Sequence, residues 1–281
     1  MARPLHVLAF ALLSTVAGCA SDPPTRDTGV WNADMSDPAQ FHRAMGRTYV
    51  AQRNWPQATA HLRESLRRDP DDAGTHVLLG IVYREQGLAR SSEASFKTAI
   101  DLDDELPEAY SALAVLYDRL GRHEDAERNH REALKLDPER ADLHNNLGFC
   151  LYLRGHWSAA VSAFQTALRL GGGVRIHNNL GFTYGHLSQF GKAFREFQRG
   201  GTEAQAYNNI GFVYEAAGDL PRAEASYVQA LRLDPKLARA RENLEQIARK
   251  IGHPVPEVPS PAGVGVAEAP VPVNTPMEVL P

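Results

Sequence analysis

Three pairs of consecutive asparagines recur in this 281-residue chain within one short phrase of sequence. The phrase reads Asn-Asn-Leu-Gly-Phe or Asn-Asn-Ile-Gly-Phe, and it begins at Asn145, Asn178 and Asn208. A side-chain amide offers both donors and acceptors, so it can pair with the N–H and C=O groups of a peptide backbone. A row of such amides would hold an extended peptide without reading its sequence, and the nearby phenylalanine rings would add apolar contacts.

The phrase recurs after 33 and then 30 residues, a period typical of proteins built from stacked helical units. Six units can be aligned on the position of its glycine, which is small in every unit. The aligned residues are Gly46, Gly80, Ala114, Gly148, Gly181 and Gly211. A glycine inside a helix costs about 1 kcal/mol relative to alanine. We therefore expect a second helix to approach closely at this position.

A second helical segment in each unit carries its own small residue, followed four residues later by a bulky one. The small residues are Ala58, Ser92, Ala126, Ala160, Ala193 and Ala223. The bulky residues are Leu62, Phe96, His130, Phe164, Phe197 and Tyr227. Each segment has only about a dozen residues and would be marginal as an isolated helix in water. Stacking of neighbouring units must therefore supply a continuous core.

This pattern resembles the tetratricopeptide repeat over residues 39–237. The resemblance implies an all-α fold, a right-handed superhelical solenoid of about six helical hairpins. The predicted array occupies 37–251, and its repeats cover 39–72, 73–106, 107–140, 141–173, 174–203 and 204–237. A capping helix with a polar outer face is expected at 238–251, followed by a disordered proline-rich tail at 252–281.

In tetratricopeptide arrays the first helix of each repeat lines a concave groove, so the resemblance places the asparagine phrases there. At about 100° per residue, the first asparagine and the phenylalanine of a phrase share one helix face, joined by Tyr152 in the first phrase. The predicted peptide-binding residues are Asn145, Asn146, Phe149, Tyr152, Asn178, Asn179, Phe182, Asn208, Asn209 and Phe212. Two alternatives stay open: the second asparagine of each pair can reflect repeat consensus alone, and the phenylalanines can pack between neighbouring helices.

The start of the chain has the features of a targeting segment. An apolar stretch over residues 5–16 is too short to cross a bilayer as a stable helix, and it leads into Val-Ala-Gly-Cys ending at Cys19. This ending resembles the lipobox of bacterial lipoproteins, which implies a signal peptide at 1–18, lipid attachment at Cys19 and a flexible linker at 19–36. Several acyl chains would anchor the protein stably. Because Ala20 stands where the family's inner-membrane retention signal has aspartate, the outer membrane is favoured, with the protein facing the periplasm. The alternative is an ordinary secretory peptide with a chance cysteine.

Composition and spacing argue against several other classes of protein. With 30 basic and 34 acidic residues the net charge is −4, which gives no basic footprint for nucleic acid. His76, His144 and His177 share one repeat position and are too widely spaced to converge on a metal, and no Cys/His cluster has zinc-motif spacing. We expect no cofactor, no small-molecule substrate and no enzymatic activity. Cys150, which has no disulfide partner if Cys19 is lipidated, is expected to pack as a small apolar residue.

The sequence therefore predicts a membrane-anchored scaffold that binds extended segments or helices of protein partners. It resembles tetratricopeptide lipoproteins of pilus and secretion systems, namely the assembly lipoproteins of tight-adherence pili and the pilotins that help type IV pilus secretins reach the outer membrane. Two alternatives remain. One is an adaptor that tethers peptidoglycan hydrolases or synthases. The other is a regulatory fragment of a glycosyltransferase, which the lack of any catalytic domain disfavours.

Overall fold

The computed structural model describes residues 37–252, 254–256 and 258. These residues fall into two compact units that divide between Cys150 and Leu151, and we call them the N-terminal and C-terminal units. The predicted signal peptide, Cys19 and the linker lie outside the described residues, as does the predicted tail beyond Val258.

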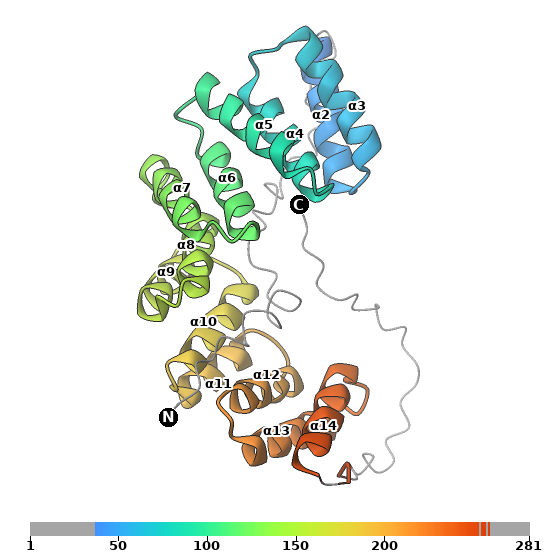
Figure 1. Ribbon diagram of the computed structural model, residues 1–281, viewed down its shortest axis with the longest axis vertical. Coiled ribbons are helices and arrows are strands. Elements are labelled where there is room, and N and C mark those ends of the chain that lie inside the picture. Colours follow the sequence, from blue (N-terminus) through green and yellow to red (C-terminus); the bar gives the residue numbers. More distant parts are fainter. Residues whose placement is uncertain (1–36, 253, 257, 259–281) are drawn as a thin grey trace. The chain divides into compact units, whose positions relative to one another are not determined.

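The described residues form helices α2 to α14 and contain no strand, as predicted (Figure 1). The N-terminal unit holds α2 (Pro38–Ala51), α3 (Trp55–Arg68), α4 (Ala73–Glu85), α5 (Ala89–Leu102), α6 (Pro107–Arg119), α7 (His123–Leu136) and most of α8 (Ala141–Leu153). The C-terminal unit holds the end of α8 and α9 (Trp157–Arg169), α10 (Val174–His186), α11 (Phe190–Arg199), α12 (Glu203–Ala216), α13 (Leu220–Leu233) and α14 (Ala238–Ile251).

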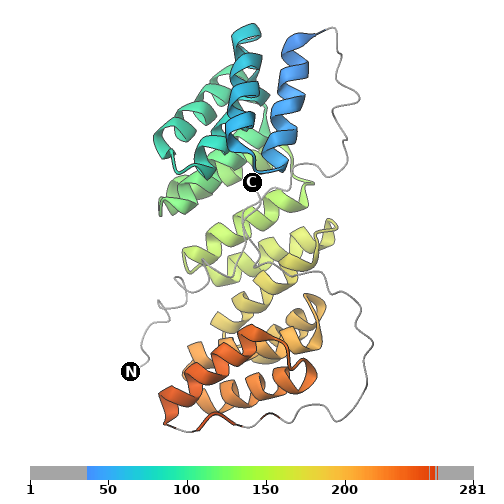
Figure 2. The same cartoon turned by 90° about the vertical axis from the view of Figure 1, so that its right-hand side faces the viewer.

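Within each unit, consecutive helices pair as hairpins and the hairpins stack. The closest pairs are α2 with α3, α4 with α5 and α6 with α7 in the N-terminal unit, and α10 with α11 and α12 with α13 in the C-terminal unit (Figures 1 and 2). First helices also contact the first helix of the next hairpin, as α4 and α6 do in one unit and α10 and α12 in the other. This stacking is what the repeat period predicted.

Four first helices approach their partner helices closely at the position of the small residue. A Cβ atom added to Gly181 would lie 2.5 Å from Cε1 of Phe197, so only glycine fits there without a shift. The same relationship holds between Gly46 and Leu62, Gly80 and Phe96, and Gly211 and Tyr227. The bulky partners are fully buried. In these four repeats the small and large residues identified in the sequence are therefore contact pairs.

The turn after the first helix adopts a left-handed backbone conformation in every hairpin. Glycine occupies it in four repeats, with φ of 75° at Gly87, 73° at Gly121, 75° at Gly155 and 83° at Gly218. In the other two repeats, Arg53 and Ser188 occupy the same position, each with φ of 56°. A side chain in this conformation costs free energy that glycine avoids. The turn geometry thus persists even where the sequence lacks the favoured residue.

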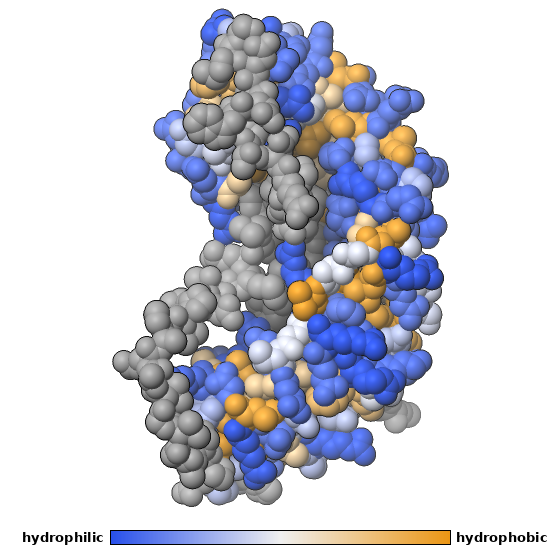
Figure 3. Space-filling view, turned by 180° about the vertical axis from the view of Figure 1, so that it is seen from behind, coloured by the Kyte–Doolittle hydropathy of each residue, from blue (hydrophilic) through white to orange (hydrophobic). Residues whose placement is uncertain are grey.

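The last helix of the C-terminal unit buries one apolar face. Ala240, Leu244, Ile247 and Ala248 of α14 are buried, whereas the basic and acidic residues around them are exposed. Figure 3 shows a face of the molecule on which hydrophilic residues predominate and apolar ones are scattered. None of the helices in the described part of the chain is both long and apolar enough to cross a membrane.

Candidate functional site

The asparagines of the C-terminal unit form a continuous ladder of side-chain hydrogen bonds. Asn243 of α14 donates to Oδ1 of Asn208 at 3.0 Å, and Asn208 donates to Oδ1 of its neighbour Asn209 at 3.3 Å. Asn209 donates in turn to Oδ1 of Asn178 at 3.4 Å, which crosses from α12 to α10. Asn178 ends the series by donating to the carbonyl oxygen of Gly200 at 3.1 Å. The amide ladder therefore links three successive first-helix positions to one another.

The N-terminal unit repeats one rung of this arrangement. Nδ2 of Asn146 lies 3.4 Å from Oγ of Ser111, the residue that stands one repeat earlier at the position of Asn145. Asn145 donates to Oδ1 of Asn146 at 3.4 Å, as Asn208 does to Asn209. In both units, then, the second asparagine of a pair reaches back to the first polar position of the preceding repeat.

Burial separates the ten predicted binding residues into two sets. The buried residues are Asn146, Asn179, Asn208, Phe149 and Tyr152. The half-buried residues are Asn145, Asn178, Asn209, Phe182 and Phe212. Only the second set has surface that a partner could touch without rearrangement. Binding by these residues stays a prediction, but the structure narrows it to the half-buried set.

The phenylalanines of α10 and α12 contact one another. The ring centroids of Phe182 and Phe212 are 6.1 Å apart with the rings at 90°, an edge-to-face arrangement. Phe182 also packs edge-to-face against Phe197 of α11 at 4.8 Å. Packing between neighbouring helices therefore accounts for part of each ring, and the remaining part is exposed. We call the half-buried surface of Asn178, Phe182, Asn209 and Phe212 the ladder face.

Tyr152 is buried and belongs to an aromatic cluster instead. Its hydroxyl lies 2.8 Å from Nε2 of His186, and the His186 ring stacks on Trp157 with centroids 4.9 Å apart. Burial lowers the pKa of His186 to about 4 and raises the pKa of the Tyr152 hydroxyl. Both groups are thus held neutral near pH 7, which suits a packing role.

The histidines that share one repeat position have local structural partners. Nε2 of His76 lies 2.9 Å from the carbonyl oxygen of Pro70, and Nε2 of His144 lies 2.8 Å from that of Pro138. In the fifth repeat, which follows three glycines in place of an Asp-Pro turn, Nδ1 of His177 pairs with Glu196 at 2.7 Å. These contacts tie each first helix to an adjacent loop or helix.

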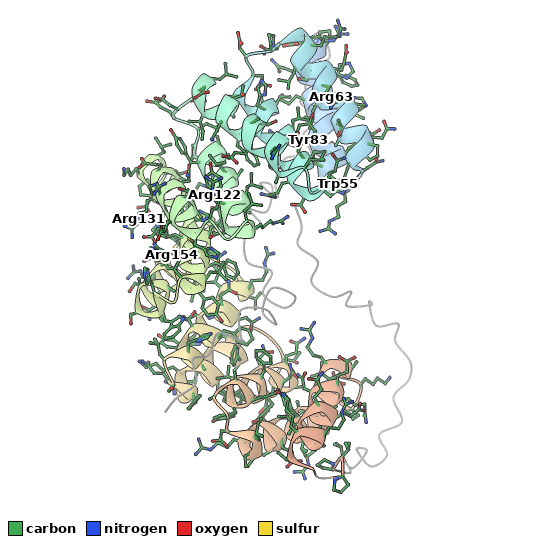
Figure 4. All side chains as sticks on the ribbon, viewed as in Figure 1. Trp55, Arg63, Tyr83, Arg122, Arg131 and Arg154 are labelled. Carbon is green, nitrogen blue, oxygen red and sulfur yellow. The ribbon has the colours of Figure 1, made fainter. Side chains whose placement is uncertain are left out.

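The sequence reasoning missed two members of the ladder. Asn243 follows Asn209 by 34 residues, so the repeat period extended into α14 would have indicated it. Gly200 contributes only a backbone carbonyl, and no side-chain pattern signals such an acceptor. Polar contacts of another kind join α3 and α4, where Arg63 donates to the hydroxyl of Tyr83 at 3.0 Å near Trp55 (Figure 4).

Family profiles match this architecture. Profiles described as tetratricopeptide repeat match residues 43–107, 77–129 and 111–174, and another matches residues 204–237. Together the matched residues make up more than half of the chain. The chain belongs to the tetratricopeptide repeat family. The prediction of a tetratricopeptide repeat solenoid is therefore confirmed, and the family's members are generally scaffolds for protein interactions. No curated protein sequence matches the chain.

Solved tetratricopeptide repeat structures share the fold at low sequence identity. PilF of Pseudomonas aeruginosa aligns with a TM-score of 0.61 and 20% identity over 75% of this chain and 98% of its own. PilW, a widely conserved type IV pilus biogenesis factor, aligns with a TM-score of 0.63 and 18% identity over 73% of this chain and 97% of its own. YrrB, a TPR protein with an unusual peptide-binding site, aligns with a TM-score of 0.51 and 18% identity over 64% and 96%. At these identities the likeness shows the fold.

Proposed function

We propose that this protein is a lipid-anchored, non-enzymatic scaffold that binds segments of protein partners during assembly of a pilus or secretion system. The observation that carries the proposal is the ladder face, where two hydrogen-bonded amides and two contacting phenylalanine rings of α10 and α12 are half-buried. The structural alignments cover nearly the whole length of PilF and PilW. PilW is a type IV pilus biogenesis factor, and this supports the pilus role.

The hydrogen-bond inventory of the ladder leaves capacity for a ligand. A side-chain amide has two N–H donors and an oxygen with two lone pairs. Asn178 uses one N–H on Gly200 and one lone pair on Asn209. Asn209 likewise donates once to Asn178 and accepts once from Asn208. As far as the described residues go, each amide therefore keeps one donor and one acceptor, already oriented by its neighbours, to pair with a peptide backbone.

Pre-orientation makes such binding thermodynamically favourable. An exposed asparagine loses rotamer freedom when a ligand arrives, whereas a side chain already held by two hydrogen bonds loses little. The half-buried rings of Phe182 and Phe212 add apolar area beside the amides. The uncharged character of these four side chains suits a backbone ligand better than a charged terminus.

Membrane attachment in this proposal rests on Cys19 and the sequence before it. Thioether and amide acylation of Cys19 would hold the scaffold at the outer membrane with its repeats in the periplasm. Labelled palmitate should enter the wild-type protein and be absent from a Cys19→Ala variant. Equal labelling of both would end the anchor proposal while leaving the binding proposal intact.

Photo-crosslinking in intact cells tests the binding surface. A photoreactive phenylalanine analogue replaces Phe212 on the ladder face or, as a matched control in the same unit, exposed Arg232 of α13. We expect a pilus or secretion-channel component to be captured from Phe212 and not from Arg232. Capture of a peptidoglycan enzyme instead would favour the adaptor function, and equal capture from both positions would exclude the ladder face.

A further inference from the structure

Three helices of the N-terminal unit bring a carboxylate, an imidazole and a thiol together in the protein interior. Asp118 lies at the end of α6, His130 in α7 and Cys150 in α8. One potential ligand atom from each lies within 4.8 Å of the other two. The side chains of Asp118 and His130 are 4% and 0% exposed, and Cys150 is fully buried. The three side chains are thus shielded from water.

Both oxygens of the Asp118 carboxylate face histidines. Oδ1 lies 2.9 Å from Nδ1 of His123, and Oδ2 lies 3.1 Å from Nε2 of His130. The sulfur of Cys150 lies 3.5 Å from the carbonyl oxygen of His123. The turn that starts α7 therefore lies against both the carboxylate and the thiol. The His123 side chain is 30% exposed and contacts Asp118, so it lies between the cluster and solvent. Figure 4 labels Arg122 and Arg131, which are the sequence neighbours of His123 and His130.

His130 has an unsatisfied nitrogen. Its Nδ1 atom is buried and has no hydrogen-bond partner among the described residues. If Nε2–H donates to Asp118, Nδ1 carries a lone pair that no donor meets. A buried polar atom left in this state costs about 1–3 kcal/mol. The nitrogen that faces Asp118 is Nε2, so Nε2 is the atom placed to share a cation with the carboxylate.

In the sixth repeat, the carboxylate at the position of Asp118 has a positively charged partner. Glu215 and Tyr227 stand where Asp118 and His130 stand in the third repeat, and their side chains are hydrogen-bonded at 3.0 Å. Glu215 also forms an ion pair with Lys250, which supplies a positive charge. The ion-pair partners of Asp118 within the described residues are the two histidines, and neither lysine nor arginine is among them. Asp118 therefore has a thiol of the fourth repeat and an unsatisfied imidazole of the third nearby, in place of a cationic side chain.

We propose that Asp118, His130 and Cys150 bind a zinc ion that joins α6, α7 and α8. Cysteine sulfur, histidine nitrogen and aspartate oxygen are the ligand types that Zn²⁺ takes, with bonds of about 2.0–2.3 Å. A thiolate ligand disfavours Mg²⁺ and Ca²⁺, which prefer oxygen donors. On binding, the Cys150 thiol releases its proton to solvent. A thiolate, a carboxylate and a neutral imidazole then give a complex without net charge, which suits a buried site.

His123 orients the carboxylate in this site. A metal-bound carboxylate is usually hydrogen-bonded to an outer partner, and Nδ1 of His123 occupies that place. A water would complete the coordination. The ligands are separated by 12 and 20 residues and lie on three helices, so they form no closely spaced sequence motif. The sequence-based expectation of no metal depended on motif spacing, which does not report this kind of site.

Cobalt titration of the full-length chain tests the proposal, with Co²⁺ as a spectroscopic probe for Zn²⁺. A Cys19→Ala background leaves Cys150 as the only thiol, because the chain has two cysteines. We expect a thiolate-to-cobalt charge-transfer band that saturates at stoichiometric metal and is displaced by zinc. Cys150→Ala should abolish the band. His123→Gln should weaken zinc binding about 10- to 100-fold, as loss of an outer partner does. Tyr227→Phe, which alters the equivalent pair of the sixth repeat, should leave binding unchanged.

Thermal unfolding provides an independent readout. Zinc should raise the melting temperature of the background chain and leave that of Cys150→Ala unchanged, because a ligand that binds only the folded state stabilises it. Absence of a thiolate band in the background chain would overturn the proposal even if Cys150→Ala failed to fold. Zinc binding of equal strength in both chains would show that exposed histidines hold the metal, and would overturn it as well.

Discussion

The side-chain amide of Asn209 on α12 donates to the side-chain oxygen of Asn178 on α10, with 3.4 Å between the two atoms. This hydrogen bond joins the first helices of two successive repeats. Asn178 is the first asparagine of its pair and Asn209 is the second asparagine of the next pair. The first position thus supplies the acceptor of this hydrogen bond and the second position supplies the donor. The paired asparagines of α12 therefore have a reason to occur together: Asn209 donates to the preceding repeat, and Asn208 accepts from Asn243 of α14.

Interrupting the amide ladder should destabilise the C-terminal unit. Asn208 is 5% exposed and bonds to both Asn243 and Asn209. Replacing it with leucine should lower the free energy of unfolding by about 1–3 kcal/mol, because two amides lose a buried partner. Urea unfolding measures the change. The exposed Gln246→Ala in α14 is the control and should stay within about 0.5 kcal/mol of wild type.

A double-mutant cycle separates the ladder from ordinary packing. If Asn208→Leu acts through its partner, combining it with Asn243→Ala should cost less than the sum of the two single changes. Strict additivity would mean that the 3.0 Å contact between these side chains contributes nothing to stability.

Filling the close contact between α10 and α11 should also be costly. In Gly181→Ala the new Cβ would meet the Phe197 ring at 2.5 Å, and overpacking of this kind costs about 1–3 kcal/mol. The helix propensity of alanine offsets about 1 kcal/mol of that. Gly191→Ala in α11 is the matched control, since the nearest atom to its added Cβ is 3.9 Å away. Calorimetry should show Gly181→Ala melting below Gly191→Ala; the reverse order would contradict the contact.

The left-handed turn at Ser188 offers a stabilising substitution. Ser188 has φ of 56°, a conformation that costs a residue with a Cβ about 1–2 kcal/mol. Ser188→Gly should remove part of this cost, offset by the greater freedom of glycine in the unfolded chain, and raise stability by up to about 1 kcal/mol. The reciprocal change Gly218→Ser, at φ of 83°, should lower it. Chemical denaturation of the two variants would reject the explanation if both moved in the same direction.

Acid should weaken the C-terminal unit through His186. Burial lowers its pKa to about 4 in the folded protein, while the unfolded chain keeps a value near 6.5. The folded state thus resists protonation, so this contribution to stability is complete above pH 6.5 and is lost as the pH falls from 6.5 towards 4. The loss is at most about 3 kcal/mol, and smaller because the ring keeps some contact with water.

The measurement is the free energy of unfolding across that pH window. His186→Gln removes the titrating group and should flatten the acid dependence, although it also breaks the 2.8 Å contact with Tyr152 and lowers stability at pH 7. Exposed His156→Gln is the matched histidine deletion in the same unit. An unchanged slope in His186→Gln would remove His186 as the source.

Much of the fold could be predicted because its determinants are local. Apolar spacing indicates a helix, and the small residue at Gly181 paired with the large Phe197 indicates where two helices approach. The ladder face was predicted only in part. Asn178 and Phe182 are half-buried and keep surface for a partner, but Tyr152 is buried and contacts His186, which stacks on Trp157. Helical periodicity gives the direction of a side chain about its own axis and not which neighbour fills the space in front of it.

By itself the sequence determined the helices, their hairpin pairing and the positions where small and large residues meet, since each follows from spacing within one repeat. Only the tertiary structure decided which asparagine bonds to which, and that Asp118, His130 and Cys150 converge. The physical reason is the offset between stacked helices. It arises from the packing of many side chains at once and sets distances between residues of different repeats, so no pattern within one repeat records it.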